Sequence, residues 1–266
     1  MKAIHDALIM RLNGEQLDEL IDQIAAEIPF ALIVNDQLLV TLVCTPTELD
    51  AMAIGFLLSE GILTERESLL DIAVDEKGAT VSVTLKKLPN GFDQIAQRKT
   101  ITSGCGQGVT FSDGANLESL PVNQVQIKAS PDYIRALLKK FRSVSDLFQK
   151  TGGIHSAALA DGNEIILFAE DIGRHNAVDK LIGRAFLDNI PLDDKILLSS
   201  GRISGEIMTK VIRNKIPILV SRTAPTCMSL TYAEDHGITL IGFARVNRMN
   251  IYTHPQRISF EVKGTG

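Results

Sequence analysis

Tryptophan is absent from this chain of 266 residues, and cysteine occurs only at positions 44, 105 and 227. Three widely spaced cysteines do not make the paired framework of a disulfide-stabilised secreted domain, so one of them is a candidate for a working thiol. Long apolar runs are also missing, since residues 30–34 and 216–220 are far shorter than the roughly 20 residues of a membrane helix. The first residues lack the unbroken apolar core of a secretory signal, and we expect a cytoplasmic protein that does not associate with membranes.

An excess of positive charge is lacking too, because 27 basic residues face 32 acidic ones and the net charge is −5. This balance argues against general binding to nucleic acids or anionic membranes, so an anionic ligand must be met by a local cluster of basic groups. Apolar residues make up 45% of the chain, which is enough to fill more than one core. We predict two domains, an α+β domain over residues 1–128 and an α/β domain over residues 129–266.

Turn-forming residues separate the β-rich runs of the first domain. Two hairpins are predicted, from residues 30–34 with 38–44 and from residues 71–75 with 80–85. A helix should follow the first hairpin, with Thr45 as N-cap, Pro46 at the first helical position and Glu48 completing a capping box. Gly61 is predicted to end this helix.

In the second domain, helical patterns alternate with short apolar runs. The predicted helices span residues 130–150, 175–188, 204–214 and 226–236, and the predicted strands span residues 155–161, 164–168, 195–199, 217–221 and 238–244. Nearly continuous apolar strands alternating with helices indicate a parallel sheet that is covered on both faces. The second domain is therefore predicted to be α/β.

Periodicity fades between residues 89 and 125, where the chain is rich in small and polar residues and contains TSGCGQG at 102–108. Its glycines leave the sulfur of Cys105 little steric cover, and an exposed thiolate can accept a sulfane sulfur as a persulfide and pass it on. The plainer alternative is a cysteine without a role, although a free exposed thiol is open to oxidation. We predict a long functional loop with Cys105 as its nucleophile.

The other two cysteines have different surroundings. Cys227 follows Thr226 in the first turn of a predicted helix, where the helix dipole would lower its pKa, so it is the rival candidate. Its neighbours Met228 and Leu230 favour partial burial and simple packing instead. Cys44 ends a predicted strand and is expected to lie in the core.

Four predicted loops at the carboxyl ends of strands each contain an arginine: Arg174, Arg202, Arg222 and Arg245. Ligands of open α/β sheets bind at this edge, and guanidinium groups suit phosphate oxygens, so we infer an anionic and phosphorylated ligand. Taken singly, each arginine is as easily explained by solvation or by pairing with a carboxylate. Asp171 is a candidate for holding a guanine or ribose group, with a structural role at the start of a helix as the alternative. The chain contains neither a P-loop nor the dinucleotide fingerprint G-x-G-x-x-G.

Metal-binding motifs are also missing, since the chain has no C-x-x-C, no H-x-E paired with P-C-x-x-C and no H-E-x-x-H. We therefore predict no metal site. His155 and His175 would suit a Cys–His hydrolase acting on nucleotides, although a single histidine is more often a hydrogen-bonded structural residue. His175, which follows Arg174 at a helix start, is the better functional candidate.

Several long segments together resemble the formate dehydrogenase accessory sulfurtransferase family, FdhD. They are EDIGRHNAVDK at residues 170–180, GGIHS at 152–156, SSGRISG at 199–205, SRTAP at 221–225 and GFLLSEGIL at 55–63. The resemblance covers nearly the whole chain. It implies a cytoplasmic homodimer whose larger domain has a cytidine-deaminase-like fold without zinc.

The resemblance also implies an activity. Such a protein takes sulfur from a cysteine desulfurase and passes it to the bis-molybdopterin guanine dinucleotide form of the molybdenum cofactor, for the catalytic subunit of a formate dehydrogenase. The persulfide cysteine of the family falls on Cys105. The cofactor-binding stretch of the family falls on Phe243, Ala244, Arg245, Val246, Asn247 and Arg248, and GDP or another guanine nucleotide is expected to mimic the bound cofactor.

One position departs from the family pattern. Many members have C-G-x-C in the loop, whereas this chain has Gly108 in place of the second cysteine. A disulfide within the loop is therefore impossible, and a relay through a single cysteine remains. The alternative function is a chaperone that binds the molybdenum cofactor without transferring sulfur.

Overall fold

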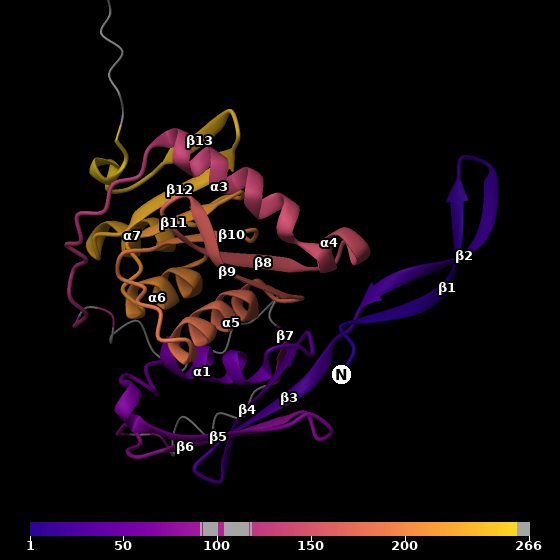
Figure 1. Cartoon of the computed structure of the whole chain (residues 1–266), viewed down its shortest axis with the longest axis horizontal. Helices are drawn as coiled ribbons and strands as arrows, with labels where there is room; N and C mark the ends of the chain where they lie inside the picture. The colour runs from indigo at the N-terminus through magenta and orange to yellow at the C-terminus, as the bar shows by residue number, and fades with distance from the viewer. Residues whose placement is uncertain (91, 93–100, 104–116, 118, 260–266) are drawn as a thin grey trace, which may run out of the picture.

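The N-terminal part of the computed structural model contains strands in a mixed parallel and antiparallel arrangement, together with an α-helix and a short 3-10 helix. The structure describes residues 1–90, 92, 101–103, 117 and 119–259. The elements of this part are β1 (Ile4–Asn13), β2 (Gln16–Ala25), β3 (Ile28–Val34), β4 (Gln37–Cys44), α1 (Leu49–Ser59), the short 3-10 helix η1 (Arg66–Ser68), β5 (Leu69–Asp75), β6 (Thr80–Leu85) and β7 (Ile101–Ser103). β1 and β2 form a separate ribbon, and the other strands form a five-stranded sheet in the order β5-β6-β3-β4-β7 (Figure 1).

Both hairpins predicted for this part are confirmed, since β3 pairs with β4 and β5 pairs with β6 in antiparallel register. The prediction for the following helix is wrong at its start. α1 begins at Leu49 after Glu48, which has a left-handed backbone with φ 50° and makes no side-chain cap. Thr45 cannot serve as the cap because its backbone N–H and its hydroxyl are both bonded to the segment around residue 171. Gly61 does end the helical turn, with φ 71° and a hydrogen bond from its N–H to the Leu58 carbonyl.

The C-terminal part is a six-stranded sheet with helices on both faces. Its elements are α3 (Pro131–Val144), α4 (Asp146–Thr151), β8 (His155–Asp161), β9 (Glu164–Asp171), α5 (Arg174–Leu187), β10 (Ile196–Ser199), α6 (Gly205–Arg213), β11 (Ile218–Ser221), α7 (Cys227–Asp235), β12 (Thr239–Arg245), β13 (Arg248–Ile251) and the 3-10 helix η3 (Pro255–Arg257). The strand order is β13-β12-β11-β10-β8-β9. All four helices and five strands predicted here are present, except that the first helix is divided into α3 and α4 at Ser145.

The prediction of a parallel sheet is only partly right. β10, β11 and β12 are parallel, whereas β8 is antiparallel to β10 and β9, and β13 is antiparallel to β12. The tight turn at Gly162, with φ 50°, joins β8 and β9 as a hairpin and so forces their opposite directions. Because β8 lies between them, β9 and β10 again point the same way.

Apolar side chains cover both faces of the six-stranded sheet, as the near-continuous apolar strands predict. α5, α6 and α7 pack on one face through residues such as Leu181, Met208 and Ala233. α3 packs on the other face through Ile134 and Leu137. None of the described helices is long and apolar enough to cross a membrane.

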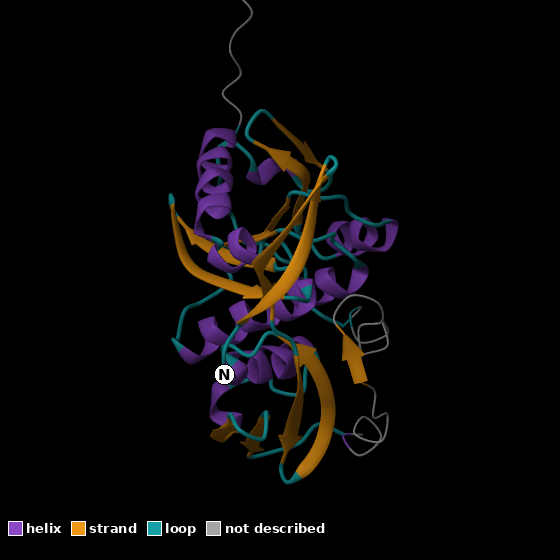
Figure 2. Ribbon diagram, turned by 90° about the vertical axis from the view of Figure 1, so that its right-hand side faces the viewer, coloured by secondary structure: helices purple, strands orange, loops and turns teal. Residues whose placement is uncertain are grey.

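The two sheets are joined through α1 and α5, which lie between them (Figure 2). The helices touch backbone to backbone at Gly55 and Gly183, because a Cβ atom at Gly183 would overlap the Ala51 carbonyl oxygen. Only glycine allows so close an approach of two helix axes. The structure is thus mixed α/β, with α1 completing the core of the five-stranded sheet. The boundary at residues 128 and 129 stays a prediction.

Candidate functional site

The arginines predicted to share one edge do follow strands that end at the same edge of the sheet. β9, β10, β11 and β12 all run in the same direction, and they lead directly into the loops with Arg174, Arg202 and Arg222 and into Arg245. β8 runs the other way, so it begins at this edge with His155. The fold therefore gathers basic side chains from four separate segments at one end of the sheet.

Arg222 and Arg245 form the centre of this basic edge. The Arg245 guanidinium donates hydrogen bonds to the carbonyl oxygens of Arg222 and Ala244. Burial lowers the pKa of Arg222, and the neighbouring guanidinium groups of Arg245 and Arg142 lower it further. Arg142, in the last turn of α3, was not predicted because no local pattern shows that this helix end reaches the edge.

No carboxylate of the described residues forms an ion pair with Arg142, Arg222 or Arg245. The alternative that these arginines simply pair with acidic neighbours thus finds no support in this part of the chain. Three neighbouring guanidinium groups repel one another, and a bound anion would relieve that repulsion.

Arg174 and Arg202 lie on the two adjoining loops. The aliphatic part of Arg174 packs over Gly201, where an added Cβ would come within 2.7 Å of the Arg174 Cβ. The Nε atom of Arg174 is buried and has no hydrogen-bond partner among the described residues. Arg202 is exposed to solvent. These two side chains extend the basic edge towards β8 and β9.

Two histidines lie beside Arg174. The Nε2 atom of His175 is 3.0 Å from the Glu206 carboxylate and 3.4 Å from the Ser204 hydroxyl. This hydrogen bond holds the pKa of Glu206 below its usual value. The Nδ1 atom of His155 is 3.2 Å from the hydroxyl of Ser200, and burial followed by the charge of Arg174 lowers the pKa of His155.

Asp171 is not placed to hold a ligand, which corrects the sequence prediction. Its carboxylate is completely buried and forms an ion pair of 2.7 Å with the equally buried Lys180. It also accepts hydrogen bonds from the N–H groups of Thr45 and Gly173 and from the Asn176 amide. Asp171 therefore fixes the start of α5 against the turn before α1, and so orients the loop with Arg174.

A second buried ion pair involves Asp179, which directly precedes Lys180 on α5. Asp179 accepts hydrogen bonds from Lys210 of α6 at 2.8 and 2.9 Å and from Ser59 of α1 at 2.7 Å. The Lys180 ammonium group also donates to the Thr45 carbonyl and the Thr47 hydroxyl. The sequence predicted neither ion pair, because the two residues of each pair lie on different secondary-structure elements. Much of the segment at 170–180 is thus structural.

The β12–β13 hairpin contains the six residues that the resemblance assigns to cofactor binding. Phe243 has a left-handed backbone with φ 48°, and the register shifts between Gly242 and Arg245. This bulge changes the direction of the strand before its exposed tip at Arg245, Val246, Asn247 and Arg248. Ala244 is buried and its carbonyl oxygen accepts a hydrogen bond from Arg245, so its side chain is not available to a ligand.

The cysteine predictions have three different outcomes. Cys105 lies outside the described residues, and its assignment stays a prediction. Cys44 is buried as expected, and burial, with the nearby Asp171 charge, raises its pKa to about 12. The expectation of partial burial for Cys227 is wrong, because its side chain is exposed at the first residue of α7, next to the capping box formed by Thr226 and Ser229.

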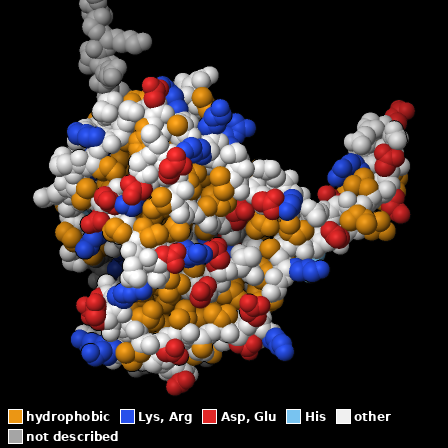
Figure 3. Space-filling view, in the orientation of Figure 1, with side chains coloured by type: hydrophobic (Ala, Val, Ile, Leu, Met, Phe, Trp, Pro, Cys, Tyr) orange, Lys and Arg blue, Asp and Glu red, His pale blue; other side chains and the backbone are white. Residues whose placement is uncertain are grey.

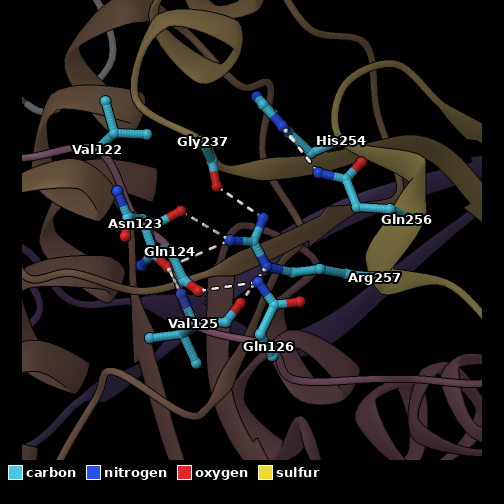
Figure 4. A pocket seen from close by; sticks show the side chains of 9 residues that line it. All are labelled: Val122, Asn123, Gln124, Val125, Gln126, Gly237, His254, Gln256 and Arg257. Atoms are coloured by element: carbon cyan, nitrogen blue, oxygen red, sulfur yellow. Dashed lines mark hydrogen bonds between the residues drawn. The ribbon is translucent and has the colours of Figure 1, made fainter.

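One further arginine, Arg257, lines a cavity of about 350 Å³ but is not part of a ligand site. Its guanidinium donates to the carbonyl oxygens of Asn123, Val125 and Gly237 (Figure 4). It also donates to the Thr239 hydroxyl. Since its donors are directed at protein oxygens, Arg257 clamps the segment before α3 onto the sheet. Among the described residues, no group of three or more His, Cys, Asp or Glu side chains is arranged to hold a metal ion.

Comparison with known proteins decides the family. The model of the FdhD/NarQ family matches residues 25–259. The chain belongs to the FdhD/NarQ family. Two curated family members are named sulfur carrier protein FdhD: one from Bacillus subtilis (strain 168) is 38% identical over 94% of this chain and 95% of its own length, and one from Staphylococcus aureus (strain MRSA252) is 36% identical over 94% of both.

The fold of this FdhD/NarQ chain is found in a solved structure as well. The crystal structure of a candidate formate dehydrogenase accessory protein from Desulfotalea psychrophila superimposes with a TM-score of 0.80. The match covers 97% of this chain and 100% of that chain at 24% sequence identity. At this identity the likeness establishes the shared fold.

Proposed function

We propose that this chain is a sulfur carrier, as the names of its FdhD relatives say of those proteins, and that it serves a formate dehydrogenase, as the name of the solved relative says of that protein. The sulfur is delivered to the bis-molybdopterin guanine dinucleotide cofactor, which is the cargo of the protein. The observation that carries this proposal is the cluster of Arg142, Arg222 and Arg245, which has no carboxylate partner in the described part of the chain. Guanidinium groups bind phosphate oxygens through paired N–H donors.

The first chemical step is assigned to Cys105. Its thiolate attacks the outer sulfur of a cysteine desulfurase persulfide, a new S–S bond forms on Cys105, and the S–S bond of the donor breaks with release of the donor thiolate. The exchange needs no external oxidant or reductant. Because Gly108 replaces the second cysteine of the family pattern, the persulfide cannot be resolved within this loop.

The remaining parts of the proposal concern the cofactor site and the assembly. A guanine nucleotide end of the cofactor would lie at the basic edge, with its phosphates near Arg222 and Arg245 and with the loops of Arg174, His175 and Arg202 beside them. The order of β9, β8, β10, β11 and β12, with β8 reversed, supports a zinc-free relative of the cytidine deaminase fold. We further propose a cytoplasmic homodimer that meets a cysteine desulfurase and the formate dehydrogenase catalytic subunit.

Nucleotide binding can be tested by calorimetry with GDP. Arg222→Ala should weaken binding by roughly 10- to 100-fold, because a charge-assisted hydrogen bond contributes about 1.5–3 kcal/mol. The matched control is Arg135→Ala on α3, since this exposed arginine is already paired with Asp132. Equal affinities for the native protein and Arg222→Ala would exclude Arg222 from the nucleotide site.

Sulfur transfer can be tested by intact-mass analysis after incubation with a cysteine desulfurase and cysteine. A persulfide adds one sulfur atom, about 32 Da, and this adduct should disappear in Cys105→Ser and remain in Cys227→Ser. Loss only in Cys227→Ser would move the carrier role to the start of α7, where that thiol is exposed. Absence of an adduct on the native protein, together with GDP binding, would leave the cofactor-binding chaperone as the function.

A further inference from the structure

The end of the six-stranded sheet opposite the basic edge contains a separate cavity. β10, β11 and β12 begin at this end, whereas their carboxyl ends form the basic edge. The segment at 121–126 runs past α7 on its way to α3 (Figure 1). Between this segment and the ends of α6 and α7 lies a cavity of about 200 Å³, called the far cavity below. It is lined, among others, by Val122, Asp193, Ile212, Lys215, His236 and Ile238. None of the arginines of the basic edge lines it, so the two sites are distinct.

Hydrogen bonds from Asn123 hold the outer wall of the far cavity in place. The backbone N–H of Asn123 donates to the His236 carbonyl oxygen at 2.9 Å, and its side-chain amide donates to the Lys215 carbonyl oxygen at 2.9 Å. These two carbonyls lie just after the last turns of α7 and α6, so one asparagine fixes the wall to both helix ends. Arg257 also donates to the carbonyl and side-chain oxygens of Asn123. The cavity is therefore preformed, as small-molecule sites usually are.

An unsatisfied polar atom belongs to the wall of the far cavity. His236 lines the cavity and is only 7% exposed. The Nδ1 atom of its ring is buried and has no hydrogen-bond partner among the described residues. Leaving a buried ring nitrogen unpaired is unfavourable, so a ligand that bonds to Nδ1 is favoured. The other walls include the apolar side chains of Val122, Ile212 and Ile238.

Two opposite charges also line the far cavity. Asp193 precedes β10 and Lys215 follows α6, and both residues are exposed. Neither forms an ion pair with the other or with any other charged group in the described part of the chain. Acidic and basic side chains are intermixed over the face of the molecule shown in Figure 3, so no broad field of one sign selects the ligand there. A ligand with one positive and one negative group therefore suits the cavity better than a simple anion or cation.

The volume of the cavity sets the size of this ligand. An apolar cavity of about 150 Å³ binds benzene, so about 200 Å³ suits a molecule of about eight non-hydrogen atoms.

We propose that the far cavity binds a zwitterionic α-amino acid with a compact apolar side chain, such as L-valine. Its ammonium group donates hydrogen bonds to the Asp193 carboxylate and to Nδ1 of His236. Its carboxylate accepts a hydrogen bond from the Lys215 ammonium group. Its side chain lies against Ile212 and Ile238. The proposal concerns a second site and does not depend on the function proposed above.

The test is ligand-observed NMR of the full-length protein with L-valine and two analogues that each lack one charged group. Isovalerate lacks the ammonium group, and isobutylamine lacks the carboxylate. L-valine should bind with a dissociation constant of about 0.1–1 mM, which is within the affinity per atom open to so small a ligand. Each analogue should bind about tenfold more weakly, because a charge-assisted hydrogen bond is lost.

Substitutions then locate the two charged groups of the ligand. Asp193→Asn should weaken L-valine binding about tenfold but should not weaken isovalerate binding, because only L-valine has an ammonium group to lose contact. Lys215→Gln should likewise weaken L-valine binding but not isobutylamine binding. His236→Leu removes the buried Nδ1 atom and should weaken L-valine binding about tenfold. The matched control is Asp36→Asn, which removes one exposed carboxylate from the turn between β3 and β4 and should bind as the native protein does.

Several results would overturn the proposal. They are no binding of L-valine by the native protein, equal binding of the three ligands, and an equal loss in Asp193→Asn and Asp36→Asn. Native affinity for L-valine in both Asp193→Asn and His236→Leu would place the amino acid elsewhere and would overturn it as well.

Discussion

Replacing Lys180 by methionine should destabilise the protein more than any surface substitution. Lys180→Met keeps most of the side-chain volume but removes the ammonium group, which is 2.7 Å from the Asp171 carboxylate. Both side chains of the pair are completely buried, so the remaining carboxylate would have no access to water. Removing one partner of a buried ion pair costs about 3–5 kcal/mol, because an uncompensated charge is left behind.

This cost can be measured as a change in the melting temperature by calorimetry. At roughly 2–4 °C per kcal/mol for a chain of this size, Lys180→Met should melt roughly 10 °C below the native protein. Lys140→Met is the matched control, since Lys140 pairs with Glu164 at the surface and should contribute no more than about 1 kcal/mol.

A double variant separates the charge from the packing. Asp171→Asn together with Lys180→Met removes both charges and should recover a large part of the lost stability. If Lys180→Met costs no more than the surface control, or if the two substitutions are simply additive, the buried ion pair does not have the role described here.

Three further predictions concern packing, pH and thiol reactivity. Gly183→Ala should cost about 3 kcal/mol, because its Cβ would overlap the facing carbonyl of α1. Gly153→Ala should be nearly neutral, because the atoms nearest to an added Cβ lie 3.9 Å away, in ordinary van der Waals contact; a similar melting temperature for both variants would refute the close contact at Gly183. Glu206→Gln should destabilise the protein at neutral pH, because the hydrogen bond with the His175 imidazole of α5 depresses the pKa of the Glu206 carboxyl. This stabilisation is present above the pKa of the unfolded state. The difference in melting temperature between the variant and the native protein should therefore vanish as the pH falls through the folded pKa, below about 4.5. Iodoacetamide followed by peptide mass analysis should label Cys227 in the native protein and Cys44 only after unfolding, since Cys44 is buried with a pKa of about 12; native labelling of Cys44 would contradict its burial.

Local sequence patterns predicted most of the secondary structure. Alternating apolar residues and turn residues such as Gly162 depend on near neighbours, so the hairpins and the four C-terminal helices were predictable. The prediction failed at the start of α1, where Thr45 has partners more than 120 residues away. The sequence patterns also did not predict the β1–β2 ribbon, because the apolar residues of these two strands do not pack into a core of the same chain.

The candidate site, like the secondary structure, was predictable only in part. Arginines that follow buried strands could be assigned to one edge, since strand ends determine loop positions. Arg142 could not be predicted as part of this site, because only the packing of α3 brings the last turn of that helix close to Arg222. The exposure of Cys227 and the burial of Asp171 were likewise not predictable, since exposure depends on which elements pack over a residue.

The sequence by itself determined the local elements, the mixed α/β class and the segments that identify the FdhD/NarQ family, because these follow from residue type and spacing along the chain. The tertiary structure alone decided the antiparallel pairing of β8 with β10, the pairing of Asp171 with Lys180 and the exposure of the ribbon. Each of these depends on contacts between residues far apart in the chain. The free energy of such contacts comes from burial and charge pairing, which only the folded arrangement brings about.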